Sequence, residues 1–225
     1  MLLETNLRGL CDHFGLDYHA FLQDLNVDEP NELTLYDLMA VSEEYEIDLY
    51  SLLFKPMYRP HLWKTKLEAI KLLILDVDGV LTDGGMYASE NGDQLKKYNT
   101  KDGMAILHLT KSDFQVGIIS SGFKGEAVKQ RADLLGIQHF YLGRDKKIDI
   151  LKGFCEKLNL DLKNVAIIGD DINDLEIIKN VGFSACPSDA VQVVKANVDI
   201  VLNKKGGKGC VREFIDHILL ESPIE

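Results

Sequence analysis

The sequence predicts an α/β protein in which a mostly parallel sheet lies between two layers of helices, with a small all-α domain in front of it. Three observations indicate this class. From residue 71 onward, apolar runs of strand length alternate with helical stretches. Polar residues follow several of those runs, and the first 60 residues have a helical pattern and a separate charge balance. Alternating strands and helices are typical of a parallel sheet covered on both faces.

The first 60 residues are acidic and helical in pattern. They carry twelve acidic and three basic side chains, a net charge of −9 out of −11 for the whole chain. An apolar rhythm of 3.6 residues over 35–45 predicts a helix, which Asn31 or Thr34 would cap. A short break at 47–48 precedes another apolar group. We therefore predict an acidic helical domain over 1–60.

Residues 35–53 resemble the closing helices of phage-repressor-like helix-turn-helix domains in a degenerate form. DNA binding requires basic side chains against phosphate, and this segment is strongly acidic. We expect docking or oligomerisation from it, with nucleic acid an unlikely partner. Pro56 and Pro60 disfavour helix continuation, so we place the domain boundary near 56–68 and a second domain over 68–225.

The sequence of the second domain predicts a Rossmann-like fold with a sheet between two layers of helices. Strands are predicted over 71–75, 115–119, 139–142, 164–168, 182–186 and 198–201, and helices over 102–112, 124–135, 146–159, 172–180, 188–194 and 209–220. The insert at 84–99 differs from this alternation. Its residues 90–93, Glu-Asn-Gly-Asp, are a strong hairpin turn signal, so we predict a β-hairpin there.

The first predicted strand ends in two carboxylates one residue apart, Asp76 and Asp78. Two aspartates close together raise each other's energy unless a cation shares the site. Open α/β sheets bind ligands beyond the carboxyl ends of their strands. This position therefore predicts a metal site with a carboxylate nucleophile.

Polar residues also follow three later strands, and their ends are expected to converge on one crevice. They are Ser120, Ser121, Lys147, Asp170, Asp171 and Asp174. Lys146 competes with Lys147, and either serine would serve as a phosphate ligand. Asp171 and Asp174 have a simpler interpretation as helix caps.

These residue types suit phosphoryl transfer with Mg²⁺, which prefers hard oxygen ligands. Asp76 is placed to attack phosphorus, and Asp78 to protonate the leaving oxygen and then activate water. Lys147 with Ser120 or Ser121 would bind the phosphoryl oxygens. The candidate metal ligands are Asp76, Asp78, Asp170, Asp171 and Asp174.

Four ordered blocks resemble the haloacid dehalogenase superfamily, above all Asp76-Val-Asp-Gly-Val-Leu-Thr-Asp-Gly84 and Gly169-Asp-Asp-Ile-Asn-Asp174. Residues 98–103 and the tail 206–213 are most similar to the cap-less 3-deoxy-D-manno-octulosonate 8-phosphate phosphatase subfamily. The acylneuraminate and nonulosonate 9-phosphate phosphatases share most of these features.

The resemblance implies a Mg²⁺-dependent phosphatase acting through an aspartyl-phosphate on a phosphorylated 2-keto-3-deoxy sugar acid, in lipopolysaccharide biosynthesis. It also implies a homotetramer in which a neighbour's hairpin and tail cover the site. The substrate contacts that it implies are Asn99, Thr100, Lys101, Asp102, Gly103 and Arg131. Leu107 stands where octulosonate enzymes commonly carry an arginine, so the preferred sugar stays open.

Composition excludes several other classes. No apolar run approaches the ~20 residues that span a bilayer, and the N-terminus lacks the pattern of a signal peptide. The four cysteines form no CxxC pair, which argues against zinc and disulfides. We expect a cytoplasmic protein without a membrane partner. The rival interpretation is a regulatory or binding protein that acts through residues 1–60.

Overall fold

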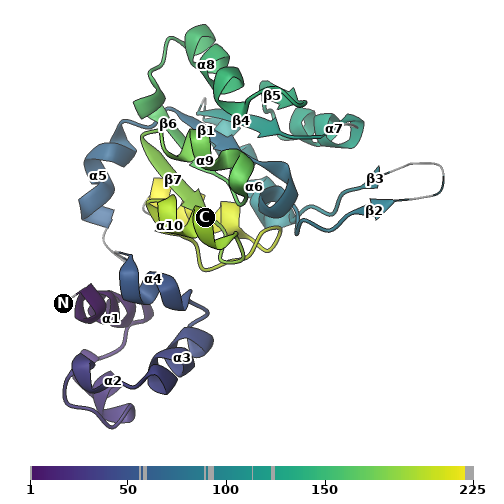
Figure 1. Cartoon of the computed structure of the whole chain (residues 1–225). Coiled ribbons are helices and arrows are strands. Elements are labelled where there is room, and N and C mark those ends of the chain that lie inside the picture. The colour runs from purple at the N-terminus through teal and green to yellow at the C-terminus, as the bar shows by residue number, and fades with distance from the viewer. Residues whose placement is uncertain are drawn as a thin grey trace. The chain divides into compact units, whose positions relative to one another are not determined.

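The computed structural model describes residues 2–220 except 56, 58, 59, 89, 91–93, 113, 123 and 124. The chain divides into two compact units, Met1–Trp63 and Lys64–Glu225 (Figure 1). The division falls inside helix α5 (Pro60–Glu68). We call the two parts the N-terminal unit and the sheet unit.

Short helices form the N-terminal unit: α1 (Leu2–Phe14), α2 (Tyr18–Asp24), η1 (Pro30–Glu32), α3 (Leu35–Glu44) and α4 (Leu49–Phe54). Thr34 caps α3 by accepting from Asp37 N, and Asp37 returns the contact in a capping box. Asp48 caps α4 in the same way, with Ser51 N as the donor. Thr34, rather than Asn31, is therefore the cap of the predicted helix.

The core of the N-terminal unit contains one buried amide. Asn6 is 0% exposed, and its Nδ2 donates to Leu52 O at 2.8 Å and to Lys55 O at 2.7 Å. Its Oδ1 accepts from Met57 N at 2.9 Å. The side chain satisfies backbone groups that the end of α4 leaves without helical partners, and it ties α1 to the segment that leads out of the unit.

Six parallel strands form the sheet of the second unit, in the order β5-β4-β1-β6-β7-β8. They are β1 (Leu72–Leu75), β4 (Gln115–Ser120), β5 (His139–Leu142), β6 (Val165–Ile168), β7 (Phe183–Cys186) and β8 (Ile200–Val201). Each of the six predicted strands is confirmed. The central strands β1 and β6 are buried at every residue, as their apolar sequences require.

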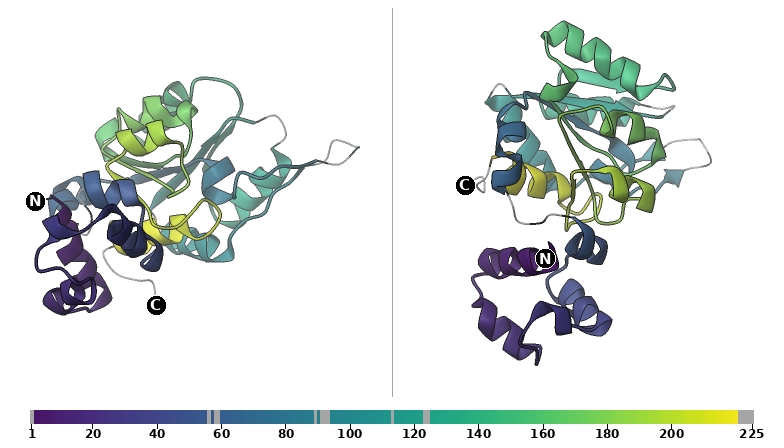
Figure 2. Two further views of the ribbon diagram at one scale, coloured as in Figure 1. Left: turned by 60° about the horizontal axis from the view of Figure 1, so that its bottom comes forward. Right: turned by 60° about the vertical axis from the view of Figure 1, so that its left-hand side comes forward.

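Helices cover both faces of this sheet, so the predicted three-layer architecture is confirmed (Figure 2). One face carries α8 (Lys147–Leu158), α9 (Leu175–Ile178) and α10 (Gln192–Asn197), whose apolar side chains share a core with those of β1 and β6. The other carries α6 (Thr100–Lys111), α7 (Glu126–Leu134) and α11 (Cys210–Glu213), which runs on into η5 (Phe214–Leu219). No helix within the described part of the chain combines the length and apolarity needed to cross a membrane.

The path of the chain creates a crevice beside β1. The chain passes from β1 to β4 and β5 on one side, and then crosses to β6, β7 and β8 on the other. Leu75, the last residue of β1, pairs with Ile118 of β4 and Ile168 of β6. The carboxyl ends of β4, β1 and β6 therefore lie next to one another at the point where strand order reverses, which is where open α/β sheets bind ligands.

The predicted helix over 188–194 is wrong in position, because α10 begins only at Gln192. Residues before it form a turn whose polar groups are engaged elsewhere. Asp189 Oδ1 accepts from Gly206 N at 2.9 Å. A long-range contact of this kind is invisible to a local periodicity, so the helix begins later than its pattern indicates.

The insert after β1 forms the predicted β-hairpin. Strand β2 (Tyr87–Ala88) pairs antiparallel with β3 (Gln94–Leu95) and extends away from the sheet (Figure 1). Residues 91–93 of the predicted turn lie outside the described residues. The chain leaves β3 through Lys96 and returns to the sheet unit at α6.

Candidate active site

Three neighbouring strands bring polar side chains to one cleft. Asp76 follows β1, Ser120 ends β4 with Ser121 behind it, and Asp170 lies just beyond β6. These ends share one edge of the sheet, since the strands are parallel neighbours. The cleft at this edge is lined by Asp76, Asp78, Gly84, Ser120, Ser121, Asp170, Asp171 and Asn173.

Three carboxylates meet at the cleft: Asp76 and Asp170 line it, and Asp174 is buried beside them. Asp76, Asp170 and Asp174 each offer an oxygen, and these atoms lie within 4.8 Å of one another. Asp76 is 5% exposed and Asp174 is 0% exposed. We call these three residues the carboxylate cluster. It joins positions from the ends of β1 and β6 that are nearly a hundred residues apart in the chain.

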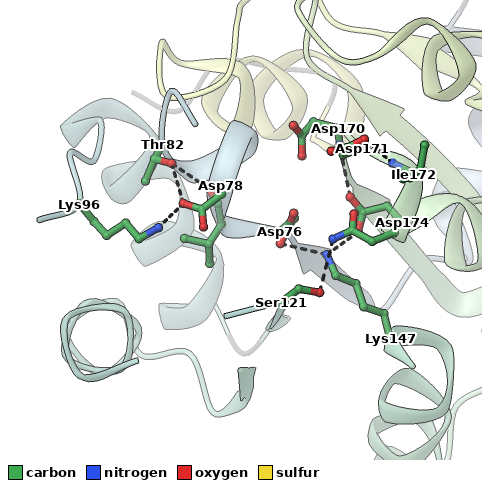
Figure 3. A network of polar contacts seen from close by, with 12 residues as sticks. Asp76, Asp78, Thr82, Lys96, Ser121, Lys147, Asp170, Asp171, Ile172 and Asp174 are labelled. Carbon is green, nitrogen blue, oxygen red and sulfur yellow. Dashed lines mark hydrogen bonds and ion pairs between the residues drawn. The ribbon is translucent and has the colours of Figure 1, made fainter. Parts of the chain in front are cut away.

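Lys147, the first residue of α8, supplies the positive charge of the cluster (Figure 3). Its Nζ lies 2.7 Å from Asp174 Oδ1 and 3.1 Å from Asp76 Oδ1. Burial by itself would lower the pKa of the ammonium, but Asp76 and Asp174 outweigh it and raise that pKa above its usual value. Lys146 is exposed at the helix cap, so Lys147 is the lysine of the cleft.

The cluster holds more negative charge than one lysine offsets. Burial, followed by the charge of Asp174, raises the pKa of Asp76 to about 6. Burial, followed by the charge of Asp76, raises the pKa of Asp170 to about 7. Both directions have one cause: carboxylates in a poorly solvated site disfavour each other's ionised form. A divalent cation among them would relieve that repulsion.

The donor set of the cluster fits Mg²⁺. It offers carboxylate oxygens, the hard ligands that this ion prefers. Asp170 Oδ1 is buried without a hydrogen-bond partner among the described residues, and such an atom calls for a ligand. Asp76 and Asp170 would hold the ion directly. Both oxygens of Asp174 already accept hydrogen bonds, Oδ1 from Lys147 Nζ at 2.7 Å and Oδ2 from Asp170 N at 3.2 Å.

Gly79 brings the loop after β1 close to the cluster. It has a φ of +86°, and a Cβ on it would lie 2.0 Å from Asp170 Oδ2. Only glycine fits here without displacing that carboxylate. The tail also packs closely against this loop, since a Cβ on Gly206 would lie 1.9 Å from Gly79 O. The nearby Gly207 N donates to Val80 O at 2.9 Å.

The sequence did not predict that Gly206 and Gly207 pack against the loop after β1. Residues 206–209 lack the spacing of a phosphate-binding loop, and the structure uses them as a turn that packs on backbone. The pair Gly206-Gly207 was the only signal of a close backbone approach.

Two predicted metal ligands have side chains outside the carboxylate cluster. Asp78 lines the cleft, but its Oδ1 accepts from Lys96 Nζ and, at 3.4 Å, from Thr82 Oγ1. Asp171 is exposed at the rim, and its Oδ1 accepts from Ile172 N at 2.7 Å. The capping interpretation thus describes Asp171, because its carboxylate serves the start of the next helical turn.

Both candidate serines line the cleft. Ser120 is 3% exposed at the end of β4. Ser121 is exposed, and its Oγ accepts from Asn173 Nδ2 at 3.4 Å. The choice between them as phosphate ligand therefore stays open, as the sequence left it.

The predicted substrate contacts lie beside the cleft and do not line it. Asn99 caps α6 through Lys101 N at 2.8 Å, and Thr100 and Lys101 are exposed. Asp102 is 1% exposed, and its Oδ1 accepts from Arg212 N at 2.7 Å. Burial raises the pKa of Asp102 to about 6. Its carboxylate is engaged with α11, so the structure makes it an anchor of the tail and leaves it little access to a ligand.

Arg131 lies over the start of α6. Its guanidinium is 5.5 Å from the centre of the Tyr98 ring, and a Cβ on Gly103 would lie 2.1 Å from its Nη2. Nε of Arg131 and the Tyr98 hydroxyl are buried without hydrogen-bond partners among the described residues. A second, small depression is lined by Leu81, Tyr98, Asn99, Asp102, Gly103, Ile106, Arg131 and Leu135.

Comparison with known proteins shows which family has this architecture. A family profile described as haloacid dehalogenase-like hydrolase matches residues 139–215. The 3-deoxy-D-manno-octulosonate 8-phosphate phosphatase KdsC of Salmonella typhimurium is 42% identical over 161 residues, which are 72% of this chain and 85% of that protein. KdsC of Escherichia coli K12 is 43% identical over 155 residues, 69% of this chain and 82% of that protein.

Solved structures agree with these relatives. The phosphatase of the same name from Yersinia pestis superposes with a TM-score of 0.67 at 38% identity, covering 69% of this chain and 84% of that one. The Moraxella catarrhalis enzyme, solved with a magnesium ion, a phosphate ion and KDO, has a TM-score of 0.67 at 35% identity, with 70% and 90% coverage. The chain belongs to the haloacid dehalogenase-like hydrolases and, within them, to the family of 3-deoxy-D-manno-octulosonate 8-phosphate phosphatases.

Proposed function

We propose that the protein is a Mg²⁺-dependent phosphatase that hydrolyses a phosphorylated 2-keto-3-deoxy sugar acid of the octulosonate 8-phosphate type. The observation that carries this proposal is the meeting of Asp76, Asp170 and Asp174 with Lys147 in one cleft. The relatives at 42–43% identity that bear this substrate in their names support it.

The reaction would proceed in two halves. Asp76 attacks phosphorus and forms an aspartyl-phosphate, while Asp78 gives a proton to the departing sugar oxygen. Asp78 then takes a proton from the water that attacks the aspartyl-phosphate, which releases inorganic phosphate and restores Asp76. The same carboxyl group is thus acid first and base second, so it returns to its starting state after each turnover.

The remaining polar groups would stabilise charge. Lys147 and Ser120 or Ser121 bind the phosphoryl oxygens, where most of the stabilisation in phosphoryl transfer is needed. Mg²⁺, held by Asp76 and Asp170, would offset the charge that otherwise repels an anionic substrate from the carboxylate cluster. Asp174 orients Lys147 through its contact at 2.7 Å.

The sugar would be recognised at an interface between subunits. We propose a homotetramer in which a neighbour's hairpin and tail cover the cleft. Residues 99–101, Gly103 and Arg131 would face the sugar acid, and Asp102 would hold the tail beside them. Exposed apolar side chains on the hairpin support this: Met86 is 70% exposed, Tyr87 56% and Leu95 70%. Arg131 suits a carboxylate, since no described hydrogen bond engages its Nε.

The substrate is tested with purified protein, octulosonate 8-phosphate and nonulosonate 9-phosphate, with and without EDTA. We expect phosphate release from octulosonate 8-phosphate with Mg²⁺, and its loss on chelation with recovery when Mg²⁺ is restored. A higher kcat/KM for nonulosonate 9-phosphate would favour the alternative sugar, which Leu107 leaves open. Inactivity on both substrates and on a wider sugar-phosphate panel would contradict the proposal.

The N-terminal unit would serve docking or oligomerisation. It presents large apolar side chains to solvent on one side of α3, with Leu35 60% exposed, Tyr36 82% and Met39 43%. A cluster of this kind often marks an interaction surface. The acidic charge of residues 1–60 argues against nucleic acid. This unit is also where a regulatory function would reside.

Removing residues 1–63 tests this role. We expect the shortened enzyme to keep its turnover, because every residue of the cleft lies beyond position 75. The number of subunits per particle, measured by light scattering, is expected to fall. A double variant of the full chain, Tyr36→Ser with Met39→Ser, should reproduce that fall. Unchanged assembly in both variants would count against oligomerisation through this surface.

We also propose a cytoplasmic location. All four cysteines are buried, and Cys11, Cys155 and Cys210 are thiols outside any disulfide. Unpaired thiols are typical of proteins in a reducing compartment, whereas secreted proteins tend to form disulfides. Fractionation of cells followed by immunodetection would test the location.

A further inference from the structure

Lys96, at the exit of the hairpin, contacts Asp78, a carboxylate that lines the cleft. Lys96 directly follows β3, and its Nζ donates to Asp78 Oδ1 (Figure 3). The side chain of Lys96 is 9% exposed, and that of Asp78 is 41% exposed. An ammonium group is seldom withdrawn from water to this degree unless a partner offsets the cost. Asp78 is that partner.

The two buried lysines near the cleft serve different carboxylates. Lys147 is bound to Asp174 at 2.7 Å and Asp76 at 3.1 Å, whereas Lys96 is bound to Asp78. Figure 3 shows the two groups on separate sides of the cleft, with Asp78 turned toward Lys96 and away from Lys147. Lys147 therefore does not hold the carboxyl group of Asp78.

Thr82 also contacts Asp78, but it holds the carboxylate less firmly than Lys96 does. Its hydroxyl lies 3.4 Å from Asp78 Oδ1 and 3.2 Å from Val77 O. A hydroxyl has one hydrogen to donate, so it serves one of these acceptors at a time. Asp78 therefore depends on Lys96 for its position.

We propose that Lys96 is a positioning residue for proton transfer, which holds Asp78 by Oδ1 and leaves Oδ2 to carry the proton. Among the described residues, no hydrogen bond engages Oδ2 of Asp78. The contact links the acid–base group to the exit of the hairpin. The inference rests on the proposed function, because it assigns Asp78 the proton transfers of a phosphatase.

This assignment predicts a dependence on the leaving group. The ratio kcat/KM reports the steps up to the release of the alcohol, and only in those steps does Asp78 act as an acid. A sugar oxygen departs poorly without a proton, whereas p-nitrophenolate is stable as the anion. A displaced Asp78 should therefore lower kcat/KM for sugar phosphates and leave kcat/KM for p-nitrophenyl phosphate unchanged.

The test compares Lys96→Met with the wild type on both kinds of substrate. General acid catalysis supplies typically 10²–10⁴-fold, so a misplaced acid should lower kcat/KM for octulosonate 8-phosphate by about 10–100-fold. The ratio for p-nitrophenyl phosphate should stay near that of the wild type. The matched control is Lys97→Met, an exposed neighbour whose Nζ lies 3.9 Å from Asp83. We expect it to resemble the wild type on both substrates.

A double-mutant cycle shows whether Lys96 acts through Asp78. In an Asp78→Asn background, Lys96→Met should cause little further loss, since there is no acid left to position. Two results would overturn the inference: an equal decrease of kcat/KM on both substrates, or an undiminished effect of Lys96→Met in the Asp78→Asn background. Either would indicate that Lys96 binds phosphate or supports the fold. A wild type inactive on every phosphate ester would instead remove the proposed function.

Discussion

Replacing Asp76 with asparagine is expected to lower kcat by about 10⁴-fold or more, as loss of a catalytic nucleophile does in other enzymes. An amide has the shape of the carboxylate but does not attack phosphorus. The fold should survive, because Asp76 is 5% exposed and burial disfavours its charge. Lys147 would keep Asp174 at 2.7 Å. Phosphate release and thermal unfolding, measured on one preparation, would separate chemistry from stability.

The matched control is Asp149→Asn, the same substitution on the surface of α8. The side chain of Asp149 is 63% exposed and lies 3.9 Å from Lys152. An ion pair of this kind contributes little to stability, so this variant should turn over as the wild type does. Normal turnover in Asp76→Asn would refute the nucleophile, whatever the control shows.

Replacing Gly79 with alanine is expected to lower kcat/KM by about 10²-fold, the loss that a displacement of roughly 1 Å produces in an active site. The new Cβ would lie 2.0 Å from Asp170 Oδ2, and the φ of +86° disfavours any side chain. Either the loop after β1 or the carboxylate must move. Since Asp170 is a proposed ligand of Mg²⁺, the Mg²⁺ concentration for half-maximal activity should rise as well.

Gly153→Ala provides the opposite expectation for the same chemical change. Gly153 lies inside α8, and a Cβ there would have no neighbour within 4 Å. Alanine in a helix interior is favoured over glycine by roughly 0.5–1 kcal/mol, so the variant should unfold at a higher temperature with unchanged activity. Similar behaviour of both variants would show that the close approach of Gly79 to Asp170 is not needed.

The strands and the carboxylates were predictable from the sequence. A strand buried on both faces must be apolar throughout, so Leu72–Leu75 and Val165–Ile168 are conspicuous in the chain. Parallel neighbours then end at the same edge, so the topology places Asp76 and Asp170 together. Lys147 follows from the order of the motifs.

Contacts between distant segments were not predictable. The pairing of Asp78 with Lys96 spans 18 residues, and that of Asp102 with Arg212 N spans 110. Neither pair leaves a periodic trace in the sequence. The late start of α10 has the same origin, because Asp189 binds Gly206 N and does not continue a helix.

The sequence by itself determined the order of strands and helices and the residue types at the ends of the strands, since these depend on local periodicity and on the burial of a continuous apolar run. Only the tertiary structure decided which carboxylate faces the cluster, which lysine serves each one, and how closely the glycines of the tail approach the loop after β1. Those outcomes depend on strand register and packing, which sum contributions from segments far apart in the chain.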